Sequence, residues 1–260
     1  MVRKFNLGLS SPGVAGALLV LVGFGLSAAA EVLPMGEAGR GREAVEELAR
    51  LLTQAENAYR NLEAYEVILH KQQRVGGRLL PKETILLKFR RPFSVAMGWV
   101  EEPFRGRRAL YVDGKNGNRL RVREKTPLGP LTLDLAPKSR MAMRGNRRPI
   151  TEAGLGPMLD ILREQFEAAH TLEGFRVAFQ HDETVFGRPA VTAVVSLPDR
   201  FAPEFRTLVL HLDRERSLPV RVSLFDESNR LVEQYGYENL NEHPELSERD
   251  FDFGSVGVDP

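Results

Sequence analysis

The stretch YEVILHKQQRVGGRLLPKETILLKF, residues 65–89, decides the fold class of this 260-residue chain. The side-chain pattern of Tyr65–Val75 and of Glu83–Phe89 has a period of two residues, which is typical of extended strands. Gly76 and Gly77 follow the first run, and glycines between two such runs favour a turn. The stretch therefore predicts a β-hairpin.

Further extended runs follow the hairpin at short intervals along the chain. They are Ser94–Val100, Arg108–Val112, Arg119–Lys125, Phe175–Thr184, Ala190–Leu197, Arg206–Asp213, Val220–Phe225 and Leu231–Tyr237. Because consecutive strands joined by short loops pair antiparallel, about ten strands should form one antiparallel sheet. Residues 126–150 show no period, and we expect them to be irregular.

Two segments have the spacing of amphipathic helices instead. Apolar residues recur every three or four positions from Glu43 to Leu62 and again over residues 153–169. We therefore predict a mainly β (α+β) protein, with one highly curved antiparallel sheet and two helices covering its concave face.

The first thirty residues have the pattern of a secretory signal peptide. Arg3 and Lys4 precede an uncharged 13-residue apolar core, and Ala28–Ala30 offers a cleavage site before Glu31. An uncleaved membrane anchor is the alternative, but a spanning helix needs about 20 apolar residues. No cysteine follows the core and no Arg-Arg pair precedes it, which indicates the general secretory pathway. We expect a soluble protein of the periplasm or cell envelope.

These patterns divide the chain into four predicted parts. They are a signal peptide at 1–30, a flexible leader at 31–42, a single curved-sheet domain with a helical lid at 43–253, and a tail at 254–260.

Charge is distributed unevenly along the chain. Residues 70–148 carry 20 Lys and Arg against 6 Asp and Glu, whereas residues 149–260 carry 10 against 21. Within the extended run at 119–125, the cations Arg119, Arg121, Arg123 and Lys125 alternate with other residues and should share one face. One hypothesis is therefore an envelope interaction module that binds an anionic polymer or partner protein through this basic face.

Residues that could carry out catalysis or bind metal form no recognisable motif. The chain has no cysteine, and its five histidines show no metal-ligand spacing. No phosphate-binding loop, nucleophile elbow or calcium loop is present in the sequence. The basic run lacks interleaved aromatic residues, which argues against nucleic acid. We expect no metal, no cofactor and no enzymatic activity, with a secreted enzyme of unrecognised site as an alternative.

The predicted strands are unusually apolar. Thr84–Phe89, Val95–Val100 and Ala190–Leu197 are apolar on both faces or nearly so. The two helices must either seal this surface as a dry core or leave a cavity that accommodates an apolar ligand. The residues alone leave both outcomes open.

Four short motifs add a resemblance to a known family. They are KFRRPFSVAMGW at 88–99, LYVDG at 110–114, YGYENLN at 235–241 and the FDF ending at 251–253. Together they resemble the domain of unknown function 1571 family of secreted bacterial proteins. More distantly they are similar to the periplasmic lipoprotein carriers and outer-membrane lipoprotein-sorting proteins. The resemblance implies an unclosed β-barrel with a helical lid over an apolar, acyl-binding cavity.

This resemblance also implies site residues and a function. Arg91, or alternatively the adjacent Arg90, matches the arginine that helps to govern lid opening in the carriers. The candidates for the cavity lining are Phe89, Met97, Trp99, Met158 and Phe166. The leading hypothesis is a non-enzymatic periplasmic carrier or binder of lipid or acylated ligands. It would be a monomer whose partners are a lipid, an acylated protein or a membrane-associated protein.

Overall fold

The computed structural model describes residues 41–198, 201 and 204–254. The signal peptide predicted at residues 1–30 and nearly all of the leader lie outside these residues, as does most of the tail.

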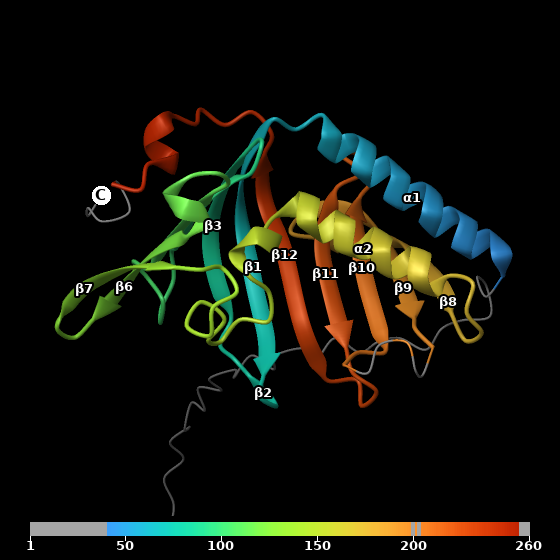
Figure 1. Ribbon diagram of the computed structural model, residues 1–260. Coiled ribbons are helices and arrows are strands. Elements are labelled where there is room, and N and C mark those ends of the chain that lie inside the picture. The colour runs from blue at the N-terminus through green and yellow to red at the C-terminus, as the bar shows by residue number, and fades with distance from the viewer. Residues whose placement is uncertain (1–40, 199–200, 202–203, 255–260) are drawn as a thin grey trace, which may run out of the picture. The chain divides into compact units, whose positions relative to one another are not determined.

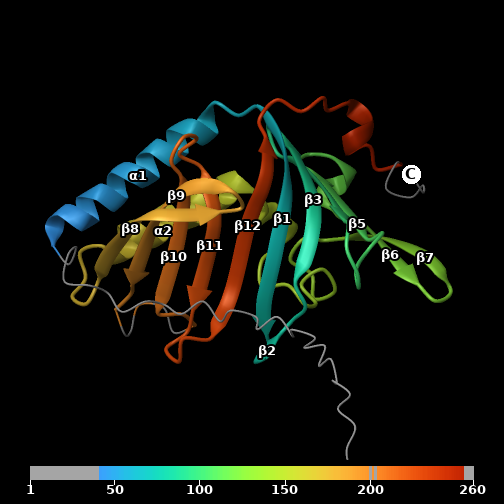
Figure 2. The same ribbon diagram turned by 180° about the vertical axis from the view of Figure 1, so that it is seen from behind.

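Twelve strands in the described residues form one antiparallel sheet that does not close (Figures 1 and 2). They are β1 (Ala64–Val75), β2 (Arg78–Leu79), β3 (Glu83–Arg90), β4 (Ser94–Trp99), β5 (Arg108–Val112), β6 (Leu120–Thr126), β7 (Gly129–Leu135), β8 (Arg176–Val185), β9 (Arg188–Ser196), β10 (Thr207–Asp213), β11 (Pro219–Phe225) and β12 (Leu231–Asn241). Their order is β7-β6-β5-β4-β3-β1-β12-β11-β10-β9-β8, with β2 beside β1. The predicted fold class, a mainly β protein built on one curved antiparallel sheet, is confirmed.

Strand β1 joins the two halves of this sheet. It pairs with β3 on one side, where Leu69 lies opposite Ile85, and with β12 on the other, where Leu69 lies opposite Tyr237. The hairpin predicted from residues 65–89 is thus the centre of the sheet, and β12, the last strand in the described residues, pairs directly with it.

Both helices, α1 (Arg42–Arg60) and α2 (Leu155–Ala169), pack on the same face of the sheet, which we call the inner face. Leu48 and Leu52 of α1 and Leu159 and Leu162 of α2 are almost completely buried in a core shared with the strands. Figure 1 shows that the helices lie over the half of the sheet formed by β8–β12.

The other half of the inner face is covered by residues 136–154, which we call the strap. The strap leads from β7 through a short 3₁₀ helix, Ile150–Glu152, into α2, and it passes over β1 and β3 (Figure 1). A further 3₁₀ helix, Glu248–Phe251, packs on the opposite, outer face, where Phe251 contacts Leu110 and Val112 of β5.

Two strands were not predicted. The prediction that residues 126–150 are irregular is wrong for Gly129–Leu135, which form β7 and pair with β6 in the register Arg121 opposite Asp134. The second addition, β2, has only two residues and pairs with the end of β1. The number of strands in the described residues is therefore twelve rather than about ten.

Candidate functional site

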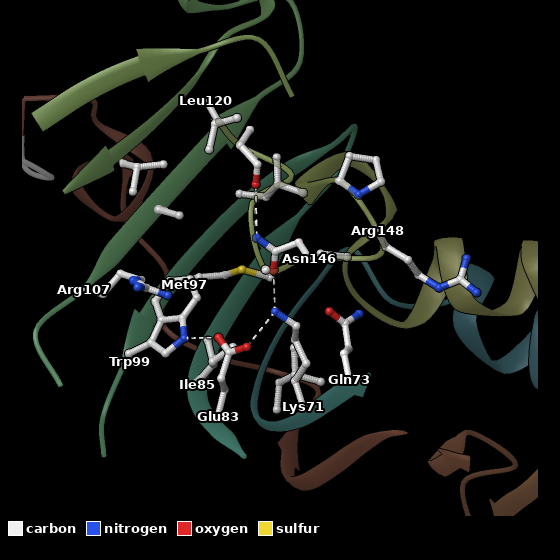
Figure 3. Close-up of a pocket in the computed structure, with 18 of the residues that line it drawn as sticks. Lys71, Gln73, Glu83, Ile85, Met97, Trp99, Arg107, Leu120, Asn146 and Arg148 are labelled. Carbon is white, nitrogen blue, oxygen red and sulfur yellow. Dashed lines mark hydrogen bonds and ion pairs between the residues drawn. The ribbon is translucent and has the colours of Figure 1, made fainter. Parts of the chain in front are cut away.

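A pocket of about 600 Å³ lies between the strap and the inner face of strands β1 and β3–β7 (Figure 3). Its sheet side is mostly apolar and is formed by Leu69, Ile85, Met97, Ala109, Leu120, Val122, Leu133 and Leu135. Its strap side includes Met141, Ala142, Gly145 and Asn146, and α2 contributes Met158. This volume is within the range of roughly 300–1,000 Å³ that is common for small-molecule sites.

Two charged side chains of the pocket neutralise each other. Lys71 Nζ lies 2.9 Å from Glu83 Oε1, and the two residues face each other across the β1–β3 pair. Trp99 donates its indole N–H to Glu83 Oε2 at 2.6 Å, and Lys71 donates to Asn146 Oδ1 of the strap at 2.6 Å (Figure 3). Because both charges are nearly buried and well partnered, they do not require a charged ligand.

A second ion pair forms the wall near β5 and β6. Arg107 Nε lies 2.8 Å from Glu124 Oε1. The Arg107 guanidinium also lies over the rings of Trp99 and Phe104, at 5.2 Å and 4.7 Å from their centroids. This arrangement holds the Trp99 indole between Glu83 and Arg107 at the side of the pocket (Figure 3).

The strap is fastened to β12 through the buried carboxylate of Glu233. Arg148 donates to Glu233 Oε1 at 2.6 Å, and the Tyr235 hydroxyl donates to Glu233 Oε2 at 2.9 Å. Burial raises the pKa of Tyr235, and the neighbouring Glu233 carboxylate raises it further. Burial alone would lower the pKa of Arg148, but the Glu233 charge outweighs it, so this pKa is raised above its ordinary value.

Gln73 of β1 connects this network to the strap backbone. Its amide nitrogen donates to the Tyr235 hydroxyl at 2.5 Å, and its oxygen accepts the Arg147 N–H at 3.1 Å. Polar bonds thus hold both the backbone and the side chains of the strap, in addition to the packing of Ala142, Ile150 and Ala153 on the core.

The start of α2 is positioned by two tyrosines. The Tyr65 hydroxyl accepts the Leu155 N–H at 2.8 Å, and the Tyr237 hydroxyl donates to the Gly154 carbonyl at 3.4 Å. Burial raises the pKa of both tyrosines, so both stay protonated at neutral pH. Gly154 has φ +97°, and a Cβ there would lie 2.3 Å from the Tyr65 hydroxyl, so this junction requires glycine.

Among the residues expected to line a cavity, Met97, Trp99 and Met158 border the pocket. Phe89 is buried in the core and stacks on Tyr65, with ring centroids 5.0 Å apart. Phe166 borders a hollow of about 30 Å³ between the helices and the sheet. Because such a hollow offers roughly the share of one water molecule, the space beside Phe166 is essentially filled.

The two arginines of the Arg-Pro motif occupy different surroundings. Arg91 donates to the carbonyls of Leu62 at 2.8 Å and Tyr59 at 3.2 Å, at the end of α1, and its guanidinium lies over the Tyr59 ring. Arg90 instead pairs with Glu248 at 2.7 Å and lies over the Phe251 ring. Arg91 therefore fastens the end of α1 to the sheet, whereas Arg90 holds the 3₁₀ helix at 248–251.

The cations of the predicted basic face are largely engaged within the chain. Arg121 pairs with Asp134 at 2.7 Å, Arg123 is buried, and Arg119 donates to the Asp134 carbonyl at 3.1 Å. Lys125 is exposed. The residues that alternate with them, Leu120 and Val122, line the pocket on the inner face.

Sequence reasoning missed Lys71, Gln73, Glu83 and Glu233 as site residues. The signal was present for the first two, because Tyr65, Val67 and Leu69 point inward and the same period continues to Lys71 and Gln73. The described part of the chain contains no group of three or more His, Cys, Asp or Glu side chains able to hold a metal ion. None of its helices is both long and apolar enough to cross a bilayer.

The fold and site define an open antiparallel sheet with two helices and a strap on one face, and with a pocket beneath the strap. The chain belongs to the family described as protein of unknown function (DUF1571), whose model matches residues 62–255. The predicted family is thereby confirmed. A comparison with curated proteins found no match.

Solved structures with a similar fold include the MucA/MucB complex of Pseudomonas aeruginosa, at 17% identity and a TM-score of 0.46. That match covers 81% of this chain and 62% of the other, so this chain spans less than two thirds of it. The lipoprotein LppX of Mycobacterium tuberculosis matches at 13% identity and a TM-score of 0.45, over 78% of this chain and 99% of that one. A putative outer membrane lipoprotein-sorting protein domain from Vibrio parahaemolyticus matches at 10% identity and a TM-score of 0.37, over 82% and 98%.

Proposed function

We propose that this protein is a non-enzymatic carrier or binder of lipid or acylated, lipoprotein-like ligands, which it holds in the pocket beneath the strap. The observation that carries the proposal is a cavity of about 600 Å³ with a mostly aliphatic and aromatic lining. Its buried charges, Lys71 and Glu83, are already paired with each other. Such a pocket favours a ligand whose bound part is apolar.

The physical gain from an acyl chain is sufficient for binding. Each buried CH₂ group contributes about 0.8 kcal/mol, so roughly ten of them contribute about 8 kcal/mol before the costs of association. No specific polar contact is therefore needed for affinity. The pattern of residues 1–30 supports export, and we place the binding activity in the periplasm or cell envelope, with the protein acting as a monomer.

The pocket can be tested by filling it. Ala109 is buried on β5 and borders the cavity, so Ala109→Trp places an indole ring in the space that an acyl chain would occupy. Binding of a dansyl-labelled fatty acid, measured by its fluorescence, should be at least about tenfold weaker in this variant. Mass spectrometry of protein purified without detergent from the cell envelope should detect co-purified lipid in the wild type and little in the variant.

A matched control is Ala178→Trp. Ala178 lies on β8 and alternates with the buried core residue Val177, so it faces away from the pocket. This variant should bind the probe like the wild type. Equal binding by the wild type and Ala109→Trp, or no binding of any acylated probe by the folded wild type, would refute the proposal.

A further inference from the structure

The tip of the β6–β7 hairpin presents an apolar side chain to solvent. Leu128 is fully exposed and Leu131 is about half exposed (47%). The tip has a defined shape, because the Thr126 hydroxyl donates to the Gly129 carbonyl at 2.6 Å and accepts the Leu128 N–H at 3.3 Å. A single exposed leucine is common on protein surfaces and does not by itself indicate a binding site. Whether Leu128 belongs to one depends on the residues around it.

The β6–β7 hairpin and the strap that follows it are strongly basic. Residues 119–154 contain nine Lys and Arg and three carboxylates, Glu124, Asp134 and Glu152. These carboxylates are already paired, with Arg107, Arg121 and Arg148. Lys138, Arg140 and Arg144 are exposed, and no described carboxylate forms an ion pair with them. Met141, which is 61% exposed, lies among these three cations in the sequence.

The hairpin and the strap both border the pocket. Val122 and Leu133 of the hairpin form part of its lining, as do Met141 and Arg144 of the strap. Figure 1 shows the β6–β7 hairpin projecting at the edge of the sheet, away from the helices. Exposed apolar side chains and unpaired cations therefore occur on the two elements that enclose the ligand space.

We propose that these two elements dock the protein on the surface of an anionic lipid bilayer. Leu128 would enter the headgroup region, and Lys138, Arg140 and Arg144 would pair with lipid phosphates. Apolar side chains combined with unpaired cations are the chemistry by which proteins bind such surfaces. This docking goes beyond the proposed ligand binding, because it does not require an occupied pocket.

A second copy of this chain fits the surface less well. Pairing of two copies at this end of the sheet would use its edge strand β7, but Pro130 lies within it. Proline on an edge strand impedes the addition of another strand.

Vesicle flotation tests the proposal directly. We expect the wild type to float with vesicles of phosphatidylcholine mixed with phosphatidylglycerol and not with phosphatidylcholine alone, and we expect added salt to weaken the binding. Leu128→Glu should weaken the partition about tenfold. The triple variant Lys138→Gln, Arg140→Gln and Arg144→Gln should weaken it about one hundredfold.

Two sets of control variants make the same kinds of substitution at positions outside the hairpin and the strap. Leu172→Glu makes the same substitution at another exposed leucine (43%), which lies beyond the end of α2, near the opposite edge of the sheet. The triple variant Arg60→Gln, Arg176→Gln and Arg214→Gln removes the same number of exposed cations from the end of α1, the start of β8 and the turn after β10. Both sets should bind anionic vesicles like the wild type.

Insertion of the hairpin tip can be measured separately, because the chain has no cysteine. A polarity-sensitive dye attached to Leu128→Cys should brighten on anionic vesicles, whereas the same dye on Leu172→Cys should not. Equal binding to neutral and anionic vesicles, unchanged binding by Leu128→Glu, or brightening without vesicles, which would indicate self-association, would each overturn the proposal. Ala109→Trp should still bind vesicles, so failure of ligand binding and failure of docking are distinguishable.

Discussion

The polar contacts that hold the strap on β12 predict that Glu233 stabilises the strap. Its side chain is only 3% exposed, and it accepts hydrogen bonds from Arg148 at 2.6 Å and from Tyr235 at 2.9 Å. Glu233→Gln keeps the size of the side chain but removes the charge that balances Arg148. The variant therefore tests whether the ion pair, rather than packing, holds the strap on β12.

The expected magnitude follows from burial. Removing one partner of a fully buried ion pair costs about 3–5 kcal/mol. The Arg148 side chain is 24% exposed, so it can recover some hydration when its partner is lost. We therefore expect Glu233→Gln to lower the free energy of unfolding by about 2–3 kcal/mol.

Two measurements separate a local effect from a global one. Urea unfolding gives the total loss, and hydrogen exchange of peptides from residues 136–154 gives the opening of the strap. A loss of about 2 kcal/mol in the strap corresponds to roughly thirtyfold faster exchange there. Glu152→Gln is the control, because Glu152 lies 3.5 Å from the same Arg148 but is 34% exposed, and it should cost less than about 1 kcal/mol. Strap exchange that stays at the wild-type rate in Glu233→Gln would refute the reasoning.

Two further predictions concern Arg91 and His211. Arg91→Gln should lower the free energy of unfolding by about 2 kcal/mol and speed exchange at the end of α1, because two charge-assisted bonds to carbonyls are lost. Wild-type exchange in α1 would contradict this role. Burial lowers the pKa of His211 below its ordinary value of 6.5, although Glu183 at 3.1 Å opposes the shift. Neutral His211 therefore stabilises the fold above about pH 6.5, and this contribution is lost as the pH falls below that value. Between neutral and mildly acidic pH, the free energy of unfolding measured with urea should decline less for His211→Asn than for the wild type. An equal decline in both proteins would contradict this role of His211.

The strands could be predicted wherever apolar and polar side chains alternate along the sequence without an intervening proline. Gly129–Leu135 alternate too, since Leu131, Leu133 and Leu135 are separated by Thr132 and Asp134. The neighbouring Pro127, Gly129 and Pro130 hid this strand, because proline and glycine usually mark turns. An edge strand tolerates Pro130, since only one of its sides needs to pair.

The site could be predicted only in part, because its polar contacts join residues distant in sequence. Met97, Trp99 and Met158 were found from their apolar character. The pairing of Lys71 with Glu83 depends on the register of the hairpin, which the residues between the two strands do not determine. The bond from Lys71 to Asn146 spans 75 positions and depends on where the strap lies, for which residues 136–149 give no periodic signal.

The position of the pocket follows from what covers each half of the sheet. Large side chains such as Leu159, Leu162 and Phe166 fill the space beneath α2, and the hollow left there is about 30 Å³. The strap instead brings Ala142, Gly145 and Asn146 over the sheet, and these are too small to fill the remaining 600 Å³. The strap packs small or partly buried apolar side chains such as Ala142 and Ile150 on the core, whereas the helices bury several leucines there, so lifting the strap should expose less apolar surface than lifting a helix. We therefore expect the strap, rather than the helices, to control entry of a ligand.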